Sequence, residues 1–265
     1  MKTSIKSLWI HHTLISRLAW RDIHSRYKGS AGGLLWALIT PILLLSVYTA
    51  VFSGIFQARW GQDGGPVEYA LQLFVGLTVH GLAAECLNRS PSLMLSNASY
   101  VKRVVFPLQV LPIINVLSSL FHFLISLGVL VAFYVFVKHS IPIFGLLYLP
   151  FIVLPYVLLL VGVTYLLAGL GVYLRDIGQI MGLVTTILLF LSPVFYPASM
   201  LPPHLQTIFM ANPLTLIIEQ SRAVLLDGMA PDLQALSVYT VGALAVLFFG
   251  LWAFNKMRKG FADVL

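Results

Sequence analysis

Two acid–base pairs at helical spacing are the residues of this chain best suited to chemistry. Glu85 and Arg89 are four residues apart, and Glu219 and Arg222 are three apart. On a helix, side chains at these spacings are neighbours and can form an ion pair. Glu85 follows a long apolar segment, where charged residues usually face protein or water and have a function. For Glu85 and Arg89 two interpretations stay open, a functional buried pair and a solvated pair at a surface.

Sequence motifs for enzyme chemistry are absent. The chain has no GxxxxGK[ST] loop for ATP, no G-x-S-x-G nucleophile, and no HExxH or Cys/His spacing for a metal. His80 and His122 lie in apolar sequence and are expected to be buried and hydrogen-bonded. The single cysteine, Cys86, allows no intrachain disulfide. We therefore predict no catalytic residues, no metal site and no cofactor bound by this chain.

Composition places the chain among membrane proteins. Hydrophobic residues make up 59% of its 265 residues and charged residues only 9%, whereas soluble domains carry about 25% charge. A chain this poor in charge cannot cover a surface that faces water, so we expect a polytopic membrane protein. The net charge of +7 is expected to set the orientation in the membrane, and no nucleic-acid partner is expected.

The gaps between charged residues predict an all-α fold with six transmembrane helices. A spanning helix needs about 20 apolar residues, and uncharged stretches cover 29–58, 69–84, 104–137, 139–174, 177–218 and 233–255. The helix of the short second stretch is expected to continue toward Leu95. The fifth stretch is expected to form one span to about Phe195 and then a broken segment. Its prolines are Pro193, Pro197, Pro202, Pro203 and Pro213.

The distribution of lysine and arginine predicts that both termini are cytoplasmic. With six spans, one face of the membrane receives most of these residues, and the other receives Arg59, Lys138 and Arg222. Cytoplasmic loops carry the excess of positive charge, so the first face is assigned to the cytoplasm. Its residues are Lys2, Lys6, Arg17, Arg21, Arg26, Lys28, Arg89, Lys102, Arg103, Arg175, Lys256, Arg258 and Lys259.

Residues 4–28 are expected to form an amphipathic helix in the cytoplasmic interface, with a polar segment without function as the alternative. At about 100° per residue, one arc holds Ile5, Leu8, Trp9, Ile15, Ala19, Trp20, Ile23 and Tyr27. The opposite arc holds Lys6, Arg17, Arg21, His24 and Lys28. Ile10 and Arg26 break the pattern. Gly29 and Gly33 then allow a sharp turn into the first span, which Pro41 can bend.

Two further segments differ from ordinary spans. In 96–106 we expect a short capped helix that ends before Pro107. Such a helix suits docking on another protein, and a turn at the membrane surface is the alternative. In 197–226 we expect short helices at about 203–211 and 214–226. Neither can cross about 30 Å of hydrocarbon, so they are interpreted as a re-entrant pair near the outer mouth of a pathway.

These segments together resemble the membrane subunit of ABC-2-type polysaccharide exporters. The similarity is strongest to exporters of lipid-linked O-antigen, with capsule and teichoic-acid exporters as relatives. It covers nearly the whole chain, and the order and spacing of the segments make it specific. The segments are "RDIHSRYKGSAGGLLWALITPILL", "NASYVKRVVFPLQVLP", "YLRDIGQI", "SPVFYPASMLPPHLQTIFMANPLTLIIEQSRAVLLDG" and the tail "FADVL".

The resemblance implies a homodimer in the bacterial inner membrane, with two cytoplasmic ATPase subunits that hold ATP and Mg. It implies an interface helix at 4–28, a coupling helix at 96–106 and periplasmic gate helices at 197–226. The implied site residues are Arg17, Arg21, Arg26 and Lys28 in the interface helix, Asn97, Tyr100, Lys102 and Arg103 in the coupling helix, and Glu219 and Arg222 in the gate.

The substrate implied by the resemblance is an undecaprenyl-linked polysaccharide that moves through an aromatic-lined channel. Aromatic planes suit the apolar C–H faces of sugars. Candidate lining residues are Trp36, Tyr48, Phe52, Phe195 and Tyr196. One alternative is an ABC-2 permease for a drug or a small lipid. Another is a proton-coupled secondary transporter, which would need intramembrane acids, and Glu85 comes nearest to one.

Overall fold

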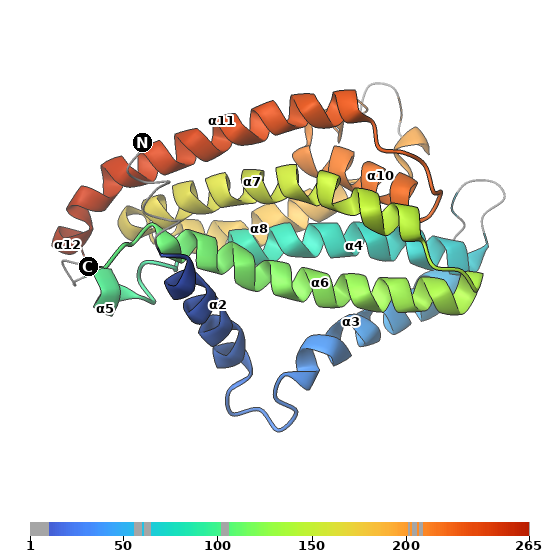
Figure 1. Cartoon of the computed structure of the whole chain (residues 1–265), viewed down its shortest axis with the longest axis horizontal. Helices are drawn as coiled ribbons and strands as arrows, with labels where there is room; N and C mark the ends of the chain where they lie inside the picture. Colours follow the sequence, from blue (N-terminus) through green and yellow to red (C-terminus); the bar gives the residue numbers. More distant parts are fainter. Residues whose placement is uncertain are drawn as a thin grey trace.

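The computed structural model describes residues 11–55, 60, 65–101, 106–200, 202, 206 and 209–264. These residues form helices joined by turns, without a strand in the described ranges, which confirms the all-α prediction (Figure 1). The first part of the chain holds α2 (His12–Tyr27), α3 (Leu35–Tyr48), the π-helix η1 (Thr49–Ile55), α4 (Pro66–Arg89) and α5 (Ala98–Val101). The rest holds α6 (Val110–Lys138), α7 (Ile143–Tyr173), α8 (Ile177–Phe190), η2 (Ala198–Met200), α10 (Pro213–Leu225), α11 (Leu233–Met257), η3 (Arg258–Gly260) and α12 (Phe261–Val264).

Helices long enough for the membrane dominate the described chain. By length and hydropathy, five described segments can cross it, namely Leu35–Phe52, Pro66–Arg89, Val110–Lys138, Ile143–Tyr173 and Leu233–Gly260. The chain is therefore a multi-pass membrane protein. The sixth expected span corresponds to α8, an apolar helix of 14 residues, which is shorter than the roughly 20 residues of a typical span. The count of six spans stays a prediction.

Helix α4 lies at the centre of the bundle, because its residues pack on several sides. It contacts α6, α7, α8, α10 and η1, and two thirds of its apolar window is buried. By contrast, α3 buries only Ala37, Pro41 and Leu45, and α8 buries only Thr185. In a single chain these two apolar helices are thus peripheral, and they present their exposed side chains to lipid or to a partner.

Close packing of α7 against α11 depends on two glycines. A Cβ atom on Gly250 of α11 would collide with the backbone of Gly162 on α7, and a Cβ on Gly162 would collide with the backbone around Leu247. Small residues at such crossings let two helical backbones approach closely where lipid offers no competing hydrophobic drive. This contact joins the last long helix to the middle of the bundle.

The turn between α2 and α3 is sharp, as the glycines in the sequence predict. Gly29 has φ +89° and Gly33 has φ +49°, values at which side chains are strained. The two helices consequently form a V beside α6, with the turn at its apex (Figure 1). Helix α5 and helix α12 lie at one end of the bundle, and the α6–α7 and α10–α11 connections lie at the opposite end (Figure 1). We call these the α5 end and the α10 end.

Candidate functional site

Helix α2 lies on the α5 end through the apolar arc that its sequence predicts. Ile15, Ala19 and Ile23 are its buried residues, and Ile15 and Ala19 belong to one cluster with the first residues of α6. Trp20, which the helical pattern also places on this arc, is 56% exposed and meets Phe121 edge-on. Within the segment predicted as the interface helix, a helix covers His12–Tyr27, and 4–10 lie outside the described residues.

The centre of the candidate site is an ion pair between α2 and α4. Arg26 Nη1 bonds to Glu85 Oε1, and His122 Nδ1 of α6 lies 3.1 Å from the same oxygen. Tyr27 Oη is 2.8 Å from His122 Nε2. His122 Nδ1 also lies 2.9 Å from Arg26 Nη1, so it donates to Glu85 in one tautomer and accepts from Arg26 in the other. One carboxylate therefore joins three helices.

A second ion pair extends this contact toward the end of α4. Arg89 Nη2 donates to both oxygens of Asp22, at 3.0 and 2.9 Å, and Arg26 Nη2 donates to Asp22 Oδ2 at 3.3 Å. The sequence placed Glu85 beside Arg89 at helical spacing, but in the structure each bonds to α2 instead. We call these six residues the α2 network, namely Asp22, Arg26, Tyr27, Glu85, Arg89 and His122.

The other basic residues expected in the interface helix face outward. Arg17, Arg21 and Lys28 are exposed, and Arg21 reaches across to α5. Its Nη1 donates to Tyr100 Oη at 2.7 Å, and its guanidinium carbon lies 5.6 Å from the centre of the Tyr100 ring. Helix α2 therefore contacts α5 with one arginine and α4 with another.

The expected coupling segment is partly described. Helix α5 covers Ala98–Val101, a single turn within the predicted 96–106. Asn97 Nδ2 donates to the Leu93 carbonyl at 2.9 Å, so this side chain closes the turn before the helix. Tyr100 stacks on Phe106 at 4.5 Å. The predicted site residues Lys102 and Arg103 lie outside the described residues.

Three of the five candidate channel aromatics meet in one cluster. Phe52 stacks near Tyr48, Tyr69 and Phe195, with ring centres 6.1, 5.8 and 5.8 Å apart, and Phe195 also meets Phe190 at 5.6 Å. The sequence interpretation missed Tyr69 and Phe190. Both are aromatic residues of predicted spans, but the sequence does not show which residues of different helices lie beside one another. We call these five residues the aromatic cluster.

Of the other two candidate aromatics, Trp36 lies apart from this cluster and Tyr196 is hydrogen-bonded to it. Trp36 is on the first turn of α3 and is 44% exposed. Tyr196 donates a hydrogen bond to the Phe190 carbonyl at 2.5 Å and meets Phe209 edge-on at 6.0 Å. The structure therefore brings the end of α3, the π-helix η1, the start of α4 and the turn after α8 together, without Trp36.

Among the described residues, Arg222 is the most enclosed charge at the α10 end. Its side chain is 3% exposed, and it donates to the carbonyls of Gln72, Pro193 and Val194 at 3.0, 2.5 and 3.0 Å. It also bonds to Glu219 at 3.0 Å. Burial lowers the pKa of Arg222 to about 10 and raises the pKa of Glu219, and at neutral pH the guanidinium stays charged.

These contacts tie α10 to α4 and to the turn after α8. The guanidinium also lies 4.3 Å from the centre of the Trp60 ring, a cation–π geometry. Helix α10 begins one residue before the expected start at about 214, because Asn212 accepts from Leu214 N at 2.9 Å and Pro213 takes the first helical position. Of the other expected short helix, 203–211, most residues lie outside the described ones.

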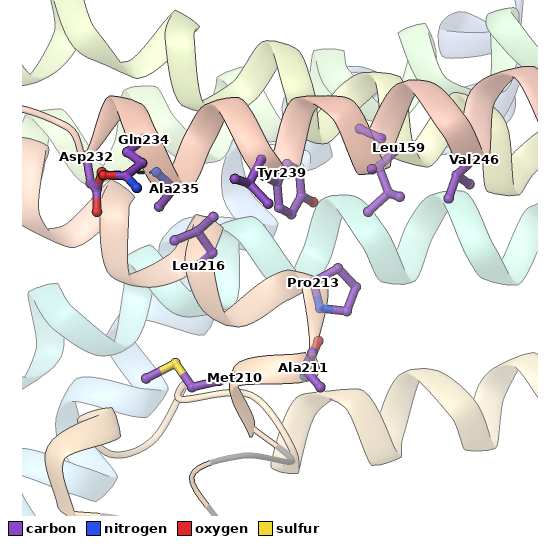
Figure 2. Close-up of a pocket in the computed structure, with 14 residues that line it drawn as sticks. Leu159, Met210, Ala211, Pro213, Leu216, Asp232, Gln234, Ala235, Tyr239 and Val246 are labelled. Atoms are coloured by element: carbon purple, nitrogen blue, oxygen red, sulfur yellow. Dashed lines mark hydrogen bonds between the residues drawn. The ribbon is translucent and has the colours of Figure 1, made fainter.

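A large apolar cavity of about 760 Å³ lies between α7, α10 and α11. Figure 2 shows Tyr239 of α11 and Leu159 of α7 above Leu216 and Pro213 of α10. Its acidic residue, Asp232, already accepts from Ala235 N at the start of α11. The lining offers hydrophobic surface beside α10 and no acid–base pair for chemistry.

Comparison with known proteins gives consistent relatives. An O-antigen export system permease protein RfbA of Klebsiella pneumoniae is 27% identical over 246 residues, 92% of each chain. The protein of the same name in Myxococcus xanthus is 24% identical over 261 residues, 98% of each. The polysialic acid transport protein KpsM of Escherichia coli is 22% identical over 254 residues, 94% of this chain and 95% of KpsM.

The family comparison covers the elements described above. The model of the family described as ABC-2 type transporter matches residues 13–226, from the first turn of α2 through the end of α10. The match thus includes the α2 network, the aromatic cluster and the Arg222 contacts. Since it extends over most of a multi-pass helical chain, this protein belongs to the ABC-2 type transporter family.

Proposed function

We propose that this chain is the permease subunit of an ATP-driven exporter of lipid-linked polysaccharide, most similar in task to O-antigen export. The observation that carries the proposal is the similarity along the whole chain to proteins named for O-antigen export and polysialic acid transport. Two copies of the subunit form the path, and two ATPase subunits bind ATP and Mg. This chain supplies the path and does no chemistry itself.

The aromatic cluster supports a glycan as the substrate. Tyr48, Phe52, Tyr69 and Phe195 stand together where α3, η1 and α4 meet the turn after α8. Flat apolar rings can contact successive sugar rings through their C–H faces without demanding one pattern of hydroxyl groups. Such a surface suits a substrate that slides, because no single sugar is held tightly.

The contacts of α2 support a route for ATP-driven movement. In the proposed mechanism, closure of the ATPase subunits displaces the segment around α5, and Arg21 bonded to Tyr100 passes the displacement to α2. The α2 network then carries it to α4 and α6, because Arg26 and Glu85 hold these helices together. Packed helices move as bodies in such transitions.

The membrane orientation follows from the positive-inside rule. The α5 end, with α2, Arg89 and α12, faces the cytoplasm, and the α10 end faces the periplasm. Both termini are then cytoplasmic, in the inner membrane of a bacterium. The segment 197–226 acts as the gate at the periplasmic side, with Arg222 holding α10 in its closed position.

A proton-coupled carrier is less well supported. Such a carrier needs an acid that gains and loses a proton during transport, and Glu85 is held in an ion pair with Arg26 and a hydrogen bond with His122. Breaking these contacts in each cycle would also release α2 from α4. The ion pair is better suited to a permanent joint.

The test is deletion of the gene in its native host, with complementation by the tagged chain. Loss of the surface polysaccharide, its accumulation inside the cell, and co-purification of an ATPase with the tagged chain are the expected results. Unchanged surface polysaccharide together with altered export of a drug or a small lipid would instead assign the chain to another ABC-2 substrate class. Transport by the purified chain without any ATPase would overturn the proposal.

A further inference from the structure

A small cavity lies between the α2 network and the aromatic cluster. It has a volume of about 310 Å³ and is lined by α3, α4 and α6, with Leu189 of α8. Glu85 and His122 line one part of it, and Tyr48 lines another. The two features of the site that the sequence treats separately therefore share one space.

Thr78 provides an unused hydrogen-bonding group at this cavity. The residue lines the cavity and is 7% exposed, and its hydroxyl has no hydrogen-bond partner within the described part of the chain. Burial of a hydroxyl without a hydrogen-bond partner costs free energy. A bound ligand or an ordered water can supply the missing partner.

Two further polar residues of the lining have bonding capacity left. His80 Nε2 lies 2.9 Å from the Thr185 carbonyl and therefore donates to it, which makes Nδ1 an acceptor. In the described part of the chain, the bonds to Glu85 from Arg26 and His122 both reach Oε1. Its second oxygen is thus available as an acceptor for a ligand that donates.

The apolar part of the lining includes aromatic rings. Tyr48 and Phe74 line the cavity, as does Phe123 from α6. A carboxylate oxygen, an imidazole acceptor and a hydroxyl beside aromatic rings suit a ring that carries both hydroxyl groups and apolar C–H faces. An acyl chain would leave the polar groups unpaired, and an anion would meet Glu85 in a lining without lysine or arginine.

The volume of the cavity suits a ligand of one ring. Small-molecule sites range from roughly 300 to 1,000 Å³, and this cavity lies at the lower end of that range. We propose that the cavity is a subsite for a single neutral sugar residue, held by Thr78, His80 and Glu85. The subsite rests on the proposed export of a glycan and identifies where one of its rings is bound within a single protomer.

Occupancy of this subsite is linked to α2. A sugar hydroxyl that donates to Glu85 binds the same carboxylate that bonds to Arg26, and His122 touches both the cavity and Tyr27. A ring in the cavity can therefore bias the contact between α2 and α4. This gives the permease a way to respond to substrate at the helix that contacts α5.

The first test compares two isosteric substitutions in the complete transporter. Thr78→Val removes the unpartnered hydroxyl of a residue that lines the cavity, and Thr164→Val removes another buried hydroxyl without a described partner, on α7, away from the cavity lining. Export of surface glycan per permease molecule should fall about fivefold for Thr78→Val, as for one lost hydrogen bond, and stay unchanged for Thr164→Val. Equal export by both variants would count against the subsite.

The second test measures binding directly. Thr78→Cys and Thr164→Cys, each with Cys86→Ser, are treated with methyl methanethiosulfonate in purified transporter, with D-glucose, D-galactose, D-mannose or N-acetyl-D-glucosamine as probes. At least one sugar should slow modification at position 78 and none at position 164. Protection by added phospholipid and by no sugar would show an acyl chain in the cavity and overturn the subsite.

The two tests separate the subsite from the proposed function. If deletion of the gene abolishes export, while Thr78→Val exports normally and no sugar protects position 78, only the subsite is refuted. If deletion leaves the surface glycan unchanged, the proposed function is refuted, and the subsite falls with it as a site for exported glycan.

Discussion

Arg26 of α2 forms an ion pair with Glu85 of α4, 59 residues further along the chain. Both side chains are mostly buried, with 20% and 24% of their surface exposed. On the helical wheel of α2, Arg26 stands out because it breaks the division into apolar and basic arcs. Its contact explains the exception, since this arginine faces the bundle and holds α2 on α4.

The first prediction concerns this ion pair. Arg26→Leu leaves the Glu85 carboxylate without its main partner, and the loss of a hydrogen bond to a buried charge costs about 2 kcal/mol. The midpoint of thermal unfolding of the purified protein should therefore fall clearly. The matched control, Arg17→Leu, changes an exposed arginine of the same helix and should leave the midpoint nearly unchanged.

A double substitution checks that the effect comes from the pair. With Arg26→Leu and Glu85→Leu together, no charge is left unpaired between the two helices. The combined loss of stability should thus be smaller than the sum of the two single losses. Simple additivity would show that the two side chains do not interact in the folded protein.

The second prediction concerns Arg222. Arg222→Lys keeps the charge, but lysine has a single nitrogen where arginine has three nitrogens in a planar fork. The ammonium group therefore cannot donate to the carbonyls of Gln72, Pro193 and Val194 at the same time. We expect a loss on the order of 3 kcal/mol, because a buried site is left with unpaired carbonyls. The measurement is again thermal unfolding, with Arg258→Lys at an exposed arginine as the control. An equal midpoint of thermal unfolding for both variants would contradict a stabilising role of the three Arg222 contacts.

Local features of the sequence were sufficient for the positions of α2 and α10. Ile15, Ala19 and Ile23, which the sequence places on one arc, are the buried residues of α2, since a helix fixes which residues share a face. Helix α10 was expected at about 214–226 and covers Pro213–Leu225, because Asn212 and Pro213 are local start signals. These features need no knowledge of distant residues.

Features that depend on residues far apart in the chain could not be predicted from the local sequence. The apolar run after residue 177 predicts a span to about Phe195, yet α8 ends at Phe190. The turn that follows has its carbonyls at Pro193 and Val194 bound by Arg222, which is 28 residues or more away along the chain. Nothing in the local pattern identifies such a partner, and the same is true of Arg26 and Glu85.

The third prediction tests the crossing of α7 and α11. Gly250→Ala places a Cβ against the Gly162 backbone, so the helices must separate, and folded protein in the membrane should decrease. Gly242→Ala on the same helix meets open space and should be neutral or stabilising by up to about 1 kcal/mol, because alanine favours helix. The check is the yield of monodisperse protein after detergent extraction, and equal yields would argue against close backbone packing.

The last prediction concerns orientation. Met229 is 61% exposed in the connection between α10 and α11, and Arg175 is exposed in the turn between α7 and α8. If the α10 end faces the periplasm, Met229→Cys in a Cys86→Ser background reacts with a membrane-impermeant maleimide in intact spheroplasts. Arg175→Cys in the same background reacts only after permeabilisation, since the excess of basic residues keeps its end in the cytoplasm. The opposite labelling pattern would show that the α10 end faces the cytoplasm. The gate could then not lie at the α10 end, nor the ATPase contact at the α5 end.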